Sequence, residues 1–184
     1  MPLPVLKIQP TMDFTQIGGI AGTSNLSVSR PNTPDGWFIF GDYTQPGLQS
    51  PLSPGYLVQV SDDDPNSPAL AEPVGWTLIT ITSPPDIQTL SGFWAPIAPQ
   101  NYVACGHVFA TTNFGEKPVI PTLRCLNANL AKSYAPASLL YNDQGNPPRY
   151  ACWSIAPLGT FFAWPLSGVT PPALAFVPTQ PIMS

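Results

Sequence analysis

The sequence predicts an all-β fold built from three copies of one unit, and three observations support this prediction. No stretch longer than about ten residues keeps apolar residues at helical spacing without a proline or glycine interrupting it. Short runs rich in β-branched and aromatic residues recur between turn residues, at 26–29, 37–40, 56–60 and 76–81. A proline-containing turn also precedes a strand-like run three times along the chain.

The composition supports short strands joined by proline-rich turns. The 184 residues include 26 prolines and 14 glycines, yet aromatic residues make up 11% and the formal net charge is only −4. Disordered chains combine few aromatics with high net charge, so the prolines are better explained as strand starts, edges and turns. The longest helix candidate, 126–137, is weakened by Pro136 and by its mixed polarity.

The repeated turn has the form Pro-x-Gly or Pro-x-Asn. It reads Pro-Asp-Gly at 34–36, Pro-Gln-Asn at 99–101 and Pro-Leu-Gly at 157–159. Glycine and asparagine tolerate a positive φ angle, so the third position of each turn has a physical reason to be one of these two residues. We therefore expect the three turns to be equivalent corners of one repeated sheet.

Strand-like segments flank each turn in the same order. The hairpins that precede the turns lie at 14–28, 76–93 and 139–153, and the strands that follow the next loops lie at 54–60, 121–126 and 172–177. These segments define repeats of approximately 11–65, 74–130 and 134–184 within a single domain, 1–184.

Each repeat is expected to supply one four-stranded sheet. A lone sheet leaves one apolar face in water, whereas three sheets can bury these faces against one another around a pseudo-threefold axis. The prediction is therefore a β-prism of three four-stranded sheets. A β-trefoil, which is also built from three four-stranded units, is the alternative.

Charge and hydropathy exclude several classes of partner. The six basic residues are scattered, whereas nucleic-acid binding requires clustered lysine and arginine, so we expect no nucleic-acid partner. No apolar run reaches about 18 residues, so no transmembrane helix is expected. The N-terminal segment MPLPVLKIQP lacks the apolar core of a signal peptide, which predicts a cytoplasmic protein or one exported without a signal peptide of the usual kind.

The sequence offers little for catalysis. It contains one histidine, His107, and few acids, so we expect no enzyme. The densest acidic run, Asp62, Asp63 and Asp64, could supply oxygen ligands to calcium, although it lacks EF-hand spacing; no other cofactor is expected. The three cysteines have no CxxC spacing and are expected to be buried free thiols, with one disulfide as the alternative.

The candidate ligand contacts lie at strand ends. Trp164 ends an aromatic strand beside Pro165, and an exposed aromatic ring suits a sugar face or a lipid interface. Asp42 and Tyr43 close the equivalent strand of the first repeat and could frame a matching site there. His107 occupies the position of Asp42 in the second repeat, where it is either a polar strand-end residue or a ligand contact.

The second repeat carries a family signature. The segment WAPIAPQNYVACGHV at 94–108, followed by LRCL at 123–126, resembles the repeat WRPxxPxGYVxLGDV…VRCV of the vacuolar protein sorting-associated protein 62 family. The segment 30–43, with Arg-Pro and then PDGWFIFGDY, is similar to another copy. Ala95 stands where the family often has arginine, and His107 where it has aspartate.

This resemblance implies a binding role and carries over no catalytic residue. Related prism modules act as lectins or as membrane-adaptor surfaces, and similar domains accompany pore-forming proteins. We therefore expect a non-enzymatic, lectin-like module that recognises glycans. One alternative is a membrane- or receptor-targeting component of a larger assembly, such as a pore-forming toxin. Another is self-association, or binding of a partner protein, through exposed strand edges.

Overall fold

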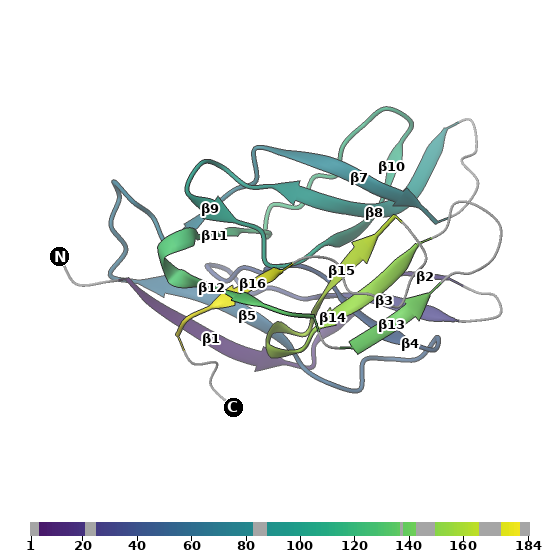
Figure 1. Cartoon of the computed structure of the whole chain (residues 1–184), viewed down its shortest axis with the longest axis horizontal. Helices are drawn as coiled ribbons and strands as arrows, with labels where there is room; N and C mark the ends of the chain where they lie inside the picture. The colour runs from purple at the N-terminus through teal and green to yellow at the C-terminus, as the bar shows by residue number, and fades with distance from the viewer. Residues whose placement is uncertain are drawn as a thin grey trace.

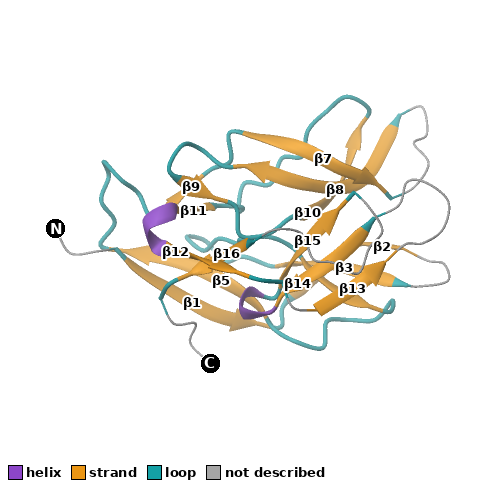
Figure 2. Cartoon of the chain, viewed as in Figure 1, coloured by secondary structure: helices purple, strands orange, loops and turns teal. Residues whose placement is uncertain are grey.

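The chain is all-β in the part that the structure, a computed structural model, describes. That part comprises residues 4–20, 25–82, 88–136, 138–142, 150–165 and 174–180. It contains sixteen strands and two short 3-10 turns (Figures 1 and 2). Neither turn has the length or hydropathy needed to cross a membrane. The segment 126–137, the helix candidate, holds the end of one strand, a 3-10 turn at Ala128–Leu130 and another strand.

The first repeat forms two antiparallel sheets. Its strands are β1 (Val5–Thr11), β2 (Phe14–Ile20), β3 (Leu26–Pro31), β4 (Tyr43–Pro46) and β5 (Gly55–Ser61). β1 pairs with β5 along its whole length, and we call this pair the base sheet. The other three strands have the order β2-β3-β4, and we call them the hairpin sheet because they contain the predicted hairpin.

The second and third repeats have the same two-sheet arrangement. The second repeat contains β6 (Leu70–Ala71), β7 (Gly75–Ile81), β8 (Thr89–Ile97), β9 (Tyr102–Val103), β10 (Val108–Asn113) and β11 (Cys125–Asn127). The third contains β12 (Ala131–Tyr134), β13 (Ser138–Asn142), β14 (Ala151–Ile155), β15 (Thr160–Trp164) and β16 (Ala175–Pro178). The hairpin sheets are β10-β8-β7 and β13-β14-β15, and the base sheets are β6-β11-β9 and β12-β16. Figure 1 shows the base sheets toward the left and the hairpin sheets toward the right.

The strand count differs from the expected three sheets of four. Each repeat begins one strand earlier than expected, with β1, β6 or β12, so the described residues hold six smaller sheets. The strand expected after the first turn is also divided: Phe38 bridges to Val58 of the base sheet, and Tyr43 starts β4 of the hairpin sheet. The chain passes from one sheet to the other at this point, which a continuous strand pattern in the sequence does not reveal.

The three predicted turns share a positive φ angle at their third position. The φ angles of Gly36, Asn101 and Gly159 are +76°, +68° and +62°. In the first two turns the closing hydrogen bond runs from Trp37 N–H to Pro34 and from Tyr102 N–H to Pro99, at 3.0 and 3.1 Å. In the third, Gly159 follows the 3-10 turn Ala156–Leu158 as its left-handed cap. The requirement for a positive φ angle is confirmed in all three repeats.

Two apolar clusters contain residues from all three repeats. One lies among the base sheets and includes Leu6, Leu126 and Val177. The other lies among the hairpin sheets and includes Phe93 and Phe161, whose rings meet edge to face at 5.2 Å. A third cluster fills the boundary between the first and second repeats. No repeat therefore completes its own core, which is why the three must fold together.

The cysteines contribute to these cores as thiols. Cys105, Cys125 and Cys152 are all buried and unpaired, which confirms the expectation of free thiols. Burial raises the pKa of Cys125 to about 11, so this thiol stays protonated near neutral pH. The three side chains act as small apolar residues.

Substitutions of Asn101 test whether the third position of the turn needs a residue that tolerates a positive φ angle. The substitution Asn101→Ala should lower the free energy of unfolding by about 1 kcal/mol, because alanine is strained at a positive φ angle, whereas Asn101→Gly should not. Urea denaturation measures both. Gln100→Ala, at the preceding exposed position, is the control. Equal midpoints for the two alanine variants would contradict the proposed constraint.

Candidate functional site

A polar groove lies along the boundary between the first and second repeats. It consists of two hollows of about 420 and 480 Å³ that meet at Ile17 and Arg30. We call them the β10 hollow, walled by β10 and the loop after it, and the β3 hollow, walled by the residues at the end of β3. The hydroxyl and amide side chains that line them are Thr15, Asn32, Thr33, Thr89, Thr111, Thr112, Asn113 and Thr122. Each hollow lies within the usual size range of small-molecule sites, roughly 300–1,000 Å³.

The groove exists because two sheet edges face each other without pairing. β2 is an edge strand of the first hairpin sheet, and β10 is an edge strand of the second. The two strands lie side by side but belong to separate sheets. Gly18 of β2 allows this approach, since a Cβ atom there would overlap the ring of Phe109.

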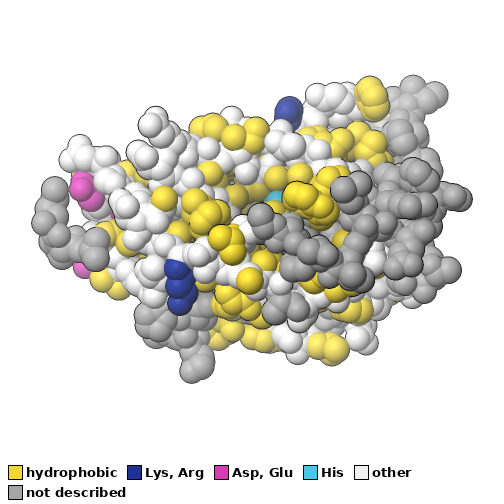
Figure 3. Space-filling model, in the orientation of Figure 1, with side chains coloured by type: hydrophobic (Ala, Val, Ile, Leu, Met, Phe, Trp, Pro, Cys, Tyr) yellow, Lys and Arg dark blue, Asp and Glu magenta, His cyan; other side chains and the backbone are white. Residues whose placement is uncertain are grey.

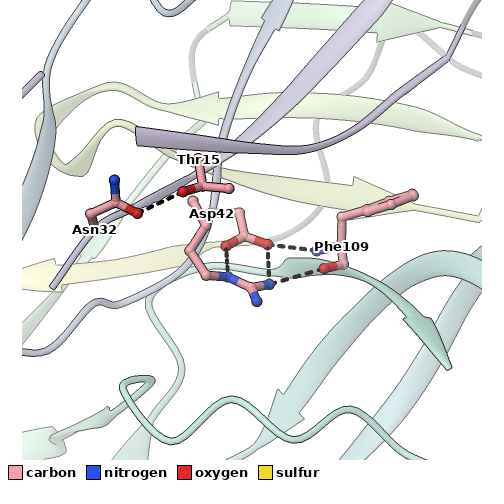
Figure 4. A network of polar contacts seen from close by, with 5 residues as sticks. Thr15, Asn32, Asp42 and Phe109 are labelled. Atoms are coloured by element: carbon pink, nitrogen blue, oxygen red, sulfur yellow. Dashed lines mark hydrogen bonds and ion pairs between the residues drawn. The ribbon is translucent and has the colours of Figure 1, made fainter. Parts of the chain in front are cut away.

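Arg30 forms the floor of the groove, where both hollows meet. Its Nε donates to Oδ1 of Asp42 at 2.7 Å and its Nη2 to Oδ2 at 2.9 Å, while Nη2 also donates to the Phe109 carbonyl at 3.0 Å. The Phe109 N–H donates back to Asp42 Oδ2 at 2.8 Å (Figure 4). On the rim, Thr15 donates its hydroxyl to Asn32 Oδ1 at 2.8 Å. The network therefore joins the first repeat to β10 of the second.

The ion pair holds the guanidinium in one orientation. Asp42 is fully buried, and the Arg30 side chain keeps 24% of its surface exposed. Burial raises the pKa of Asp42 above its ordinary value, and this outweighs the hydrogen bonds and charge of Arg30 and the Phe109 N–H, which lower it. Because both carboxylate oxygens of Asp42 accept hydrogen bonds from N–H groups, the geometry is that of an ionised carboxylate in a bidentate pair. Arg30 Nη1 makes no hydrogen bond to any residue that the structure describes.

The remaining charges at the groove also balance. Glu116 and Lys117 follow β10 and line its hollow. Glu116 accepts a hydrogen bond from Asn113 at 2.8 Å, and Lys117 donates to the Trp76 carbonyl at 3.0 Å. Together with Arg30 and Asp42, Glu116 and Lys117 bring the charged side chains at the groove to two basic and two acidic ones. Within the described ranges, no group of three or more histidine, cysteine or acidic side chains is placed to hold a metal ion.

Comparison with known proteins identifies the family. The model of the family described as vacuolar protein sorting-associated protein 62 matches residues 4–160. The chain belongs to this family. The fold is similar to that in the crystal structure of GNIP1Aa from Chromobacterium piscinae, with a TM-score of 0.78 and 20% sequence identity over 98% of this chain. The chain spans 38% of the length of GNIP1Aa. A search of curated proteins gave no match.

The arginine and aspartate positions of the family repeat come together in space. Strand register makes Ser29, Trp94 and Trp153 equivalent, since they face Tyr43, Val108 and Phe162 in the three hairpin sheets. The adjoining family positions are therefore occupied by Arg30 with Asp42, Ala95 with His107, and Ser154 with Phe161. Only the first repeat keeps the charged pair. Where arginine is absent in the second, the aspartate is absent too, which avoids an unpaired buried carboxylate.

His107 is a structural link between repeats. Its side chain is only 4% exposed, and its Nδ1 accepts the Ala163 N–H at 3.0 Å. Burial lowers its pKa to about 3, so the ring is neutral at pH 7 and its proton is on Nε2. The His107 backbone accepts from Asp42 N–H and donates to the Phe161 carbonyl. His107 is therefore a buried polar residue just before β10 that is hydrogen-bonded to the third repeat.

The other predicted contacts do not form one site. Asp42 and Tyr43 are buried, at 0% and 8% exposed, and the Tyr43 hydroxyl donates to Gln45 at 3.2 Å, so they do not face a surface ligand as expected. Trp164 is 41% exposed at the end of β15 but does not line the groove. Sequence reasoning missed Arg30 as a site residue, although its place in the family repeat was a usable signal.

The acidic run stabilises its own turn. Asp63 accepts the Ala69 N–H at 2.8 Å, and Asp64 accepts the Asn66 N–H at 2.9 Å. Asp62 has a positive φ angle of 55°. Two of the three carboxylates thus cap backbone amides of the loop, which is a common role for aspartate in turns.

The ion pair can be tested by a double-mutant cycle. Arg30→Met should lower the free energy of unfolding by about 3–5 kcal/mol, because it leaves the buried Asp42 carboxylate unpaired. Asp42→Asn keeps an acceptor for the Phe109 N–H without a charge. The double variant should therefore be more stable than Arg30→Met alone in urea denaturation. If the losses of the two single variants add up to the loss of the double variant, the two side chains are not coupled.

His107 makes stability depend on pH. Its pKa is about 3 in the folded chain against 6.5 when unperturbed, so the unfolded state binds more protons between these values. The free energy of unfolding should fall as pH drops below about 6.5, with a slope approaching about 1.4 kcal/mol per pH unit. His107→Gln retains an acceptor for the Ala163 N–H but does not titrate. Its stability deficit relative to the native sequence should shrink from pH 7 to pH 4, and a constant deficit would contradict this assignment.

Proposed function

We propose that this chain is a non-enzymatic binding module that recognises glycans in the groove between its first two repeats, on a pseudo-threefold β-prism scaffold. The observation that carries the proposal is the set of eight hydroxyl and amide side chains that line the two hollows on either hand of a guanidinium held by Asp42. Sugars present many hydroxyls that donate and accept hydrogen bonds, so a wall of short neutral polar groups is complementary to them. Ile17, Ala110 and Ile120 add apolar surface for the C–H faces of sugar rings.

The acids of the groove favour binding over hydrolysis. Glycoside hydrolysis usually requires two carboxyl groups that flank the scissile bond. Glu116 lines the groove, but Asp42 lies behind Arg30, where it is fully buried and fully hydrogen-bonded. This arrangement supports a site that holds a sugar without cleaving it.

A second candidate is a membrane- or receptor-targeting component of a larger assembly. Large apolar side chains project from the loops that follow β4 and β10, with Leu52 73%, Phe114 67% and Val119 86% exposed. On the face drawn in Figure 3, hydrophobic side chains form patches among few charged ones. Exposed apolar patches of this kind mark interaction surfaces. That the fold makes up 38% of the GNIP1Aa chain is compatible with a targeting module joined to other parts.

A glycan array with matched groove variants tests the first proposal. Thr111 and Thr77 are both exposed threonines on edge strands of one sheet, but only Thr111 lines the groove. The native sequence should bind a subset of glycans, Thr111→Trp should abolish binding by filling the β10 hollow, and Thr77→Trp should retain it. If no glycan binds while the protein floats with phosphatidylcholine vesicles, the second candidate replaces the first.

A further inference from the structure

We infer, on the basis of the proposed function, that the groove takes an internal segment of a linear, uncharged glycan and does not select a terminal sugar. The first reason is the shape of the site. The two hollows share Ile17 and Arg30, and from there one extends along β10 to Asn113 and the other past the end of β3 to Asn32 and Thr33. A ligand that contacts Arg30 can therefore continue in both directions, whereas a site for a chain end is closed on one side.

The groove follows the direction of the strands. Asn113 ends β10 opposite Thr89, at the tip end of the hairpin sheet. Asn32 follows the last residue of β3 and donates its N–H to the Asp13 carbonyl, at the end of the first repeat's hairpin sheet that lies away from its β2–β3 hairpin tip. These two amide side chains thus mark the two ends of the groove, with Arg30 between them. A ligand that reaches both must be extended.

The backbone of β10 adds a donor and an acceptor to the groove wall. The Phe109 N–H and carbonyl both point toward the first repeat, where they bond Asp42 and Arg30. Backbone groups two residues apart in a strand point to the same side, so the Thr111 N–H and carbonyl face the groove. Neither has a backbone partner among the described residues. Together with Arg30 Nη1, they form a row of polar groups whose positions are set by the backbone and the ion pair.

Such a row suits a repeating ligand. The groups are held by the strand and by Asp42, so little conformational entropy is lost when a ligand binds them. A linear oligosaccharide presents hydroxyls at regular intervals along its length and can engage the row in more than one register. Terminal sugars offer no comparable advantage from an open-ended row.

The charge balance selects against acidic glycans. Arg30 is paired with Asp42, and Lys117 follows Glu116 in the lining, so these groups carry as many negative as positive charges. The chain as a whole has a formal net charge of −4. Uronic or sulfated sugars would gain little from a groove whose charges balance and would be repelled at long range. Neutral sugars are not repelled by the net charge of the chain.

The experiment measures affinity against ligand length and charge by isothermal titration calorimetry. The probes are neutral β-1,4-linked gluco-, manno- and xylo-oligosaccharides of two to six units, with oligogalacturonates of the same lengths as the acidic set. The variants are Asn113→Ala in the β10 hollow, Asn32→Ala in the β3 hollow, and Asn129→Ala as a control, since Asn129 is exposed and outside the groove.

The expected result is that at least one neutral series binds more tightly as it lengthens, by roughly tenfold from two to six units. Asn32→Ala and Asn113→Ala should each weaken binding of the longest oligosaccharide by about fivefold, the effect of one lost hydrogen bond, and Asn129→Ala should not. Disaccharides that bind as tightly as hexasaccharides, or acidic chains that bind more tightly with strong salt dependence, would overturn this inference and leave the proposed function standing. The absence of binding to any glycan, here and on the array, would refute the proposed function itself.

Discussion

The structure depends on the close approach of three chain segments, one from each repeat, between the base and hairpin sheets. Gly41 and Gly106 make this contact possible: a Cβ atom at Gly41 would lie 2.9 Å from the His107 carbonyl oxygen, and one at Gly106 would lie 2.8 Å from the Thr160 Cβ. Thr160 in turn donates its hydroxyl to the Cys105 carbonyl at 2.9 Å. Since no side chain fits between these segments, their backbones hydrogen-bond directly, and the two shared cores close on either side of them.

The polar residues beside this crossing show how three copies of one repeat have diverged. Asp42 and His107 each accept a backbone N–H from the next repeat, that of Phe109 and Ala163 respectively. The first repeat satisfies its buried carboxylate with Arg30, and the second uses a neutral imidazole that needs no counter-ion. The same inter-repeat hydrogen bond is thus preserved with different charge. Only the first repeat places a guanidinium, that of Arg30, at the surface. The three boundaries between repeats are therefore not equivalent.

The groove follows from that divergence. Arg30 reaches from β3 to the Phe109 carbonyl of β10, and the neighbouring edge strands β2 and β10 stay in separate sheets. The space between them is lined by threonine and asparagine because these strands face water on this side. A structural ion pair and a guanidinium that lines the groove are therefore combined in one side chain.

The local features of this protein were determined by the sequence itself. These features depend on residues that are neighbours in sequence. The structure contains the three Pro-x-Gly or Pro-x-Asn turns and the hairpins at 14–28, 76–93 and 139–153. The family could also be recognised, because the repeat at 94–108 is contiguous. The extra strands β1, β6 and β12 were missed, since β6 is only two residues long and each takes a partner far along the chain.

Which side chains reach the surface was decided only by the tertiary structure. Asp42, Tyr43 and His107 lie at strand ends, where polar residues are usually exposed, but segments of the other repeats cover them. Arg30 becomes a site residue only because Phe109, 79 positions away, supplies a carbonyl beside it. Burial and proximity of this kind depend on how separate segments pack together, and no pattern of neighbouring residues encodes that packing directly.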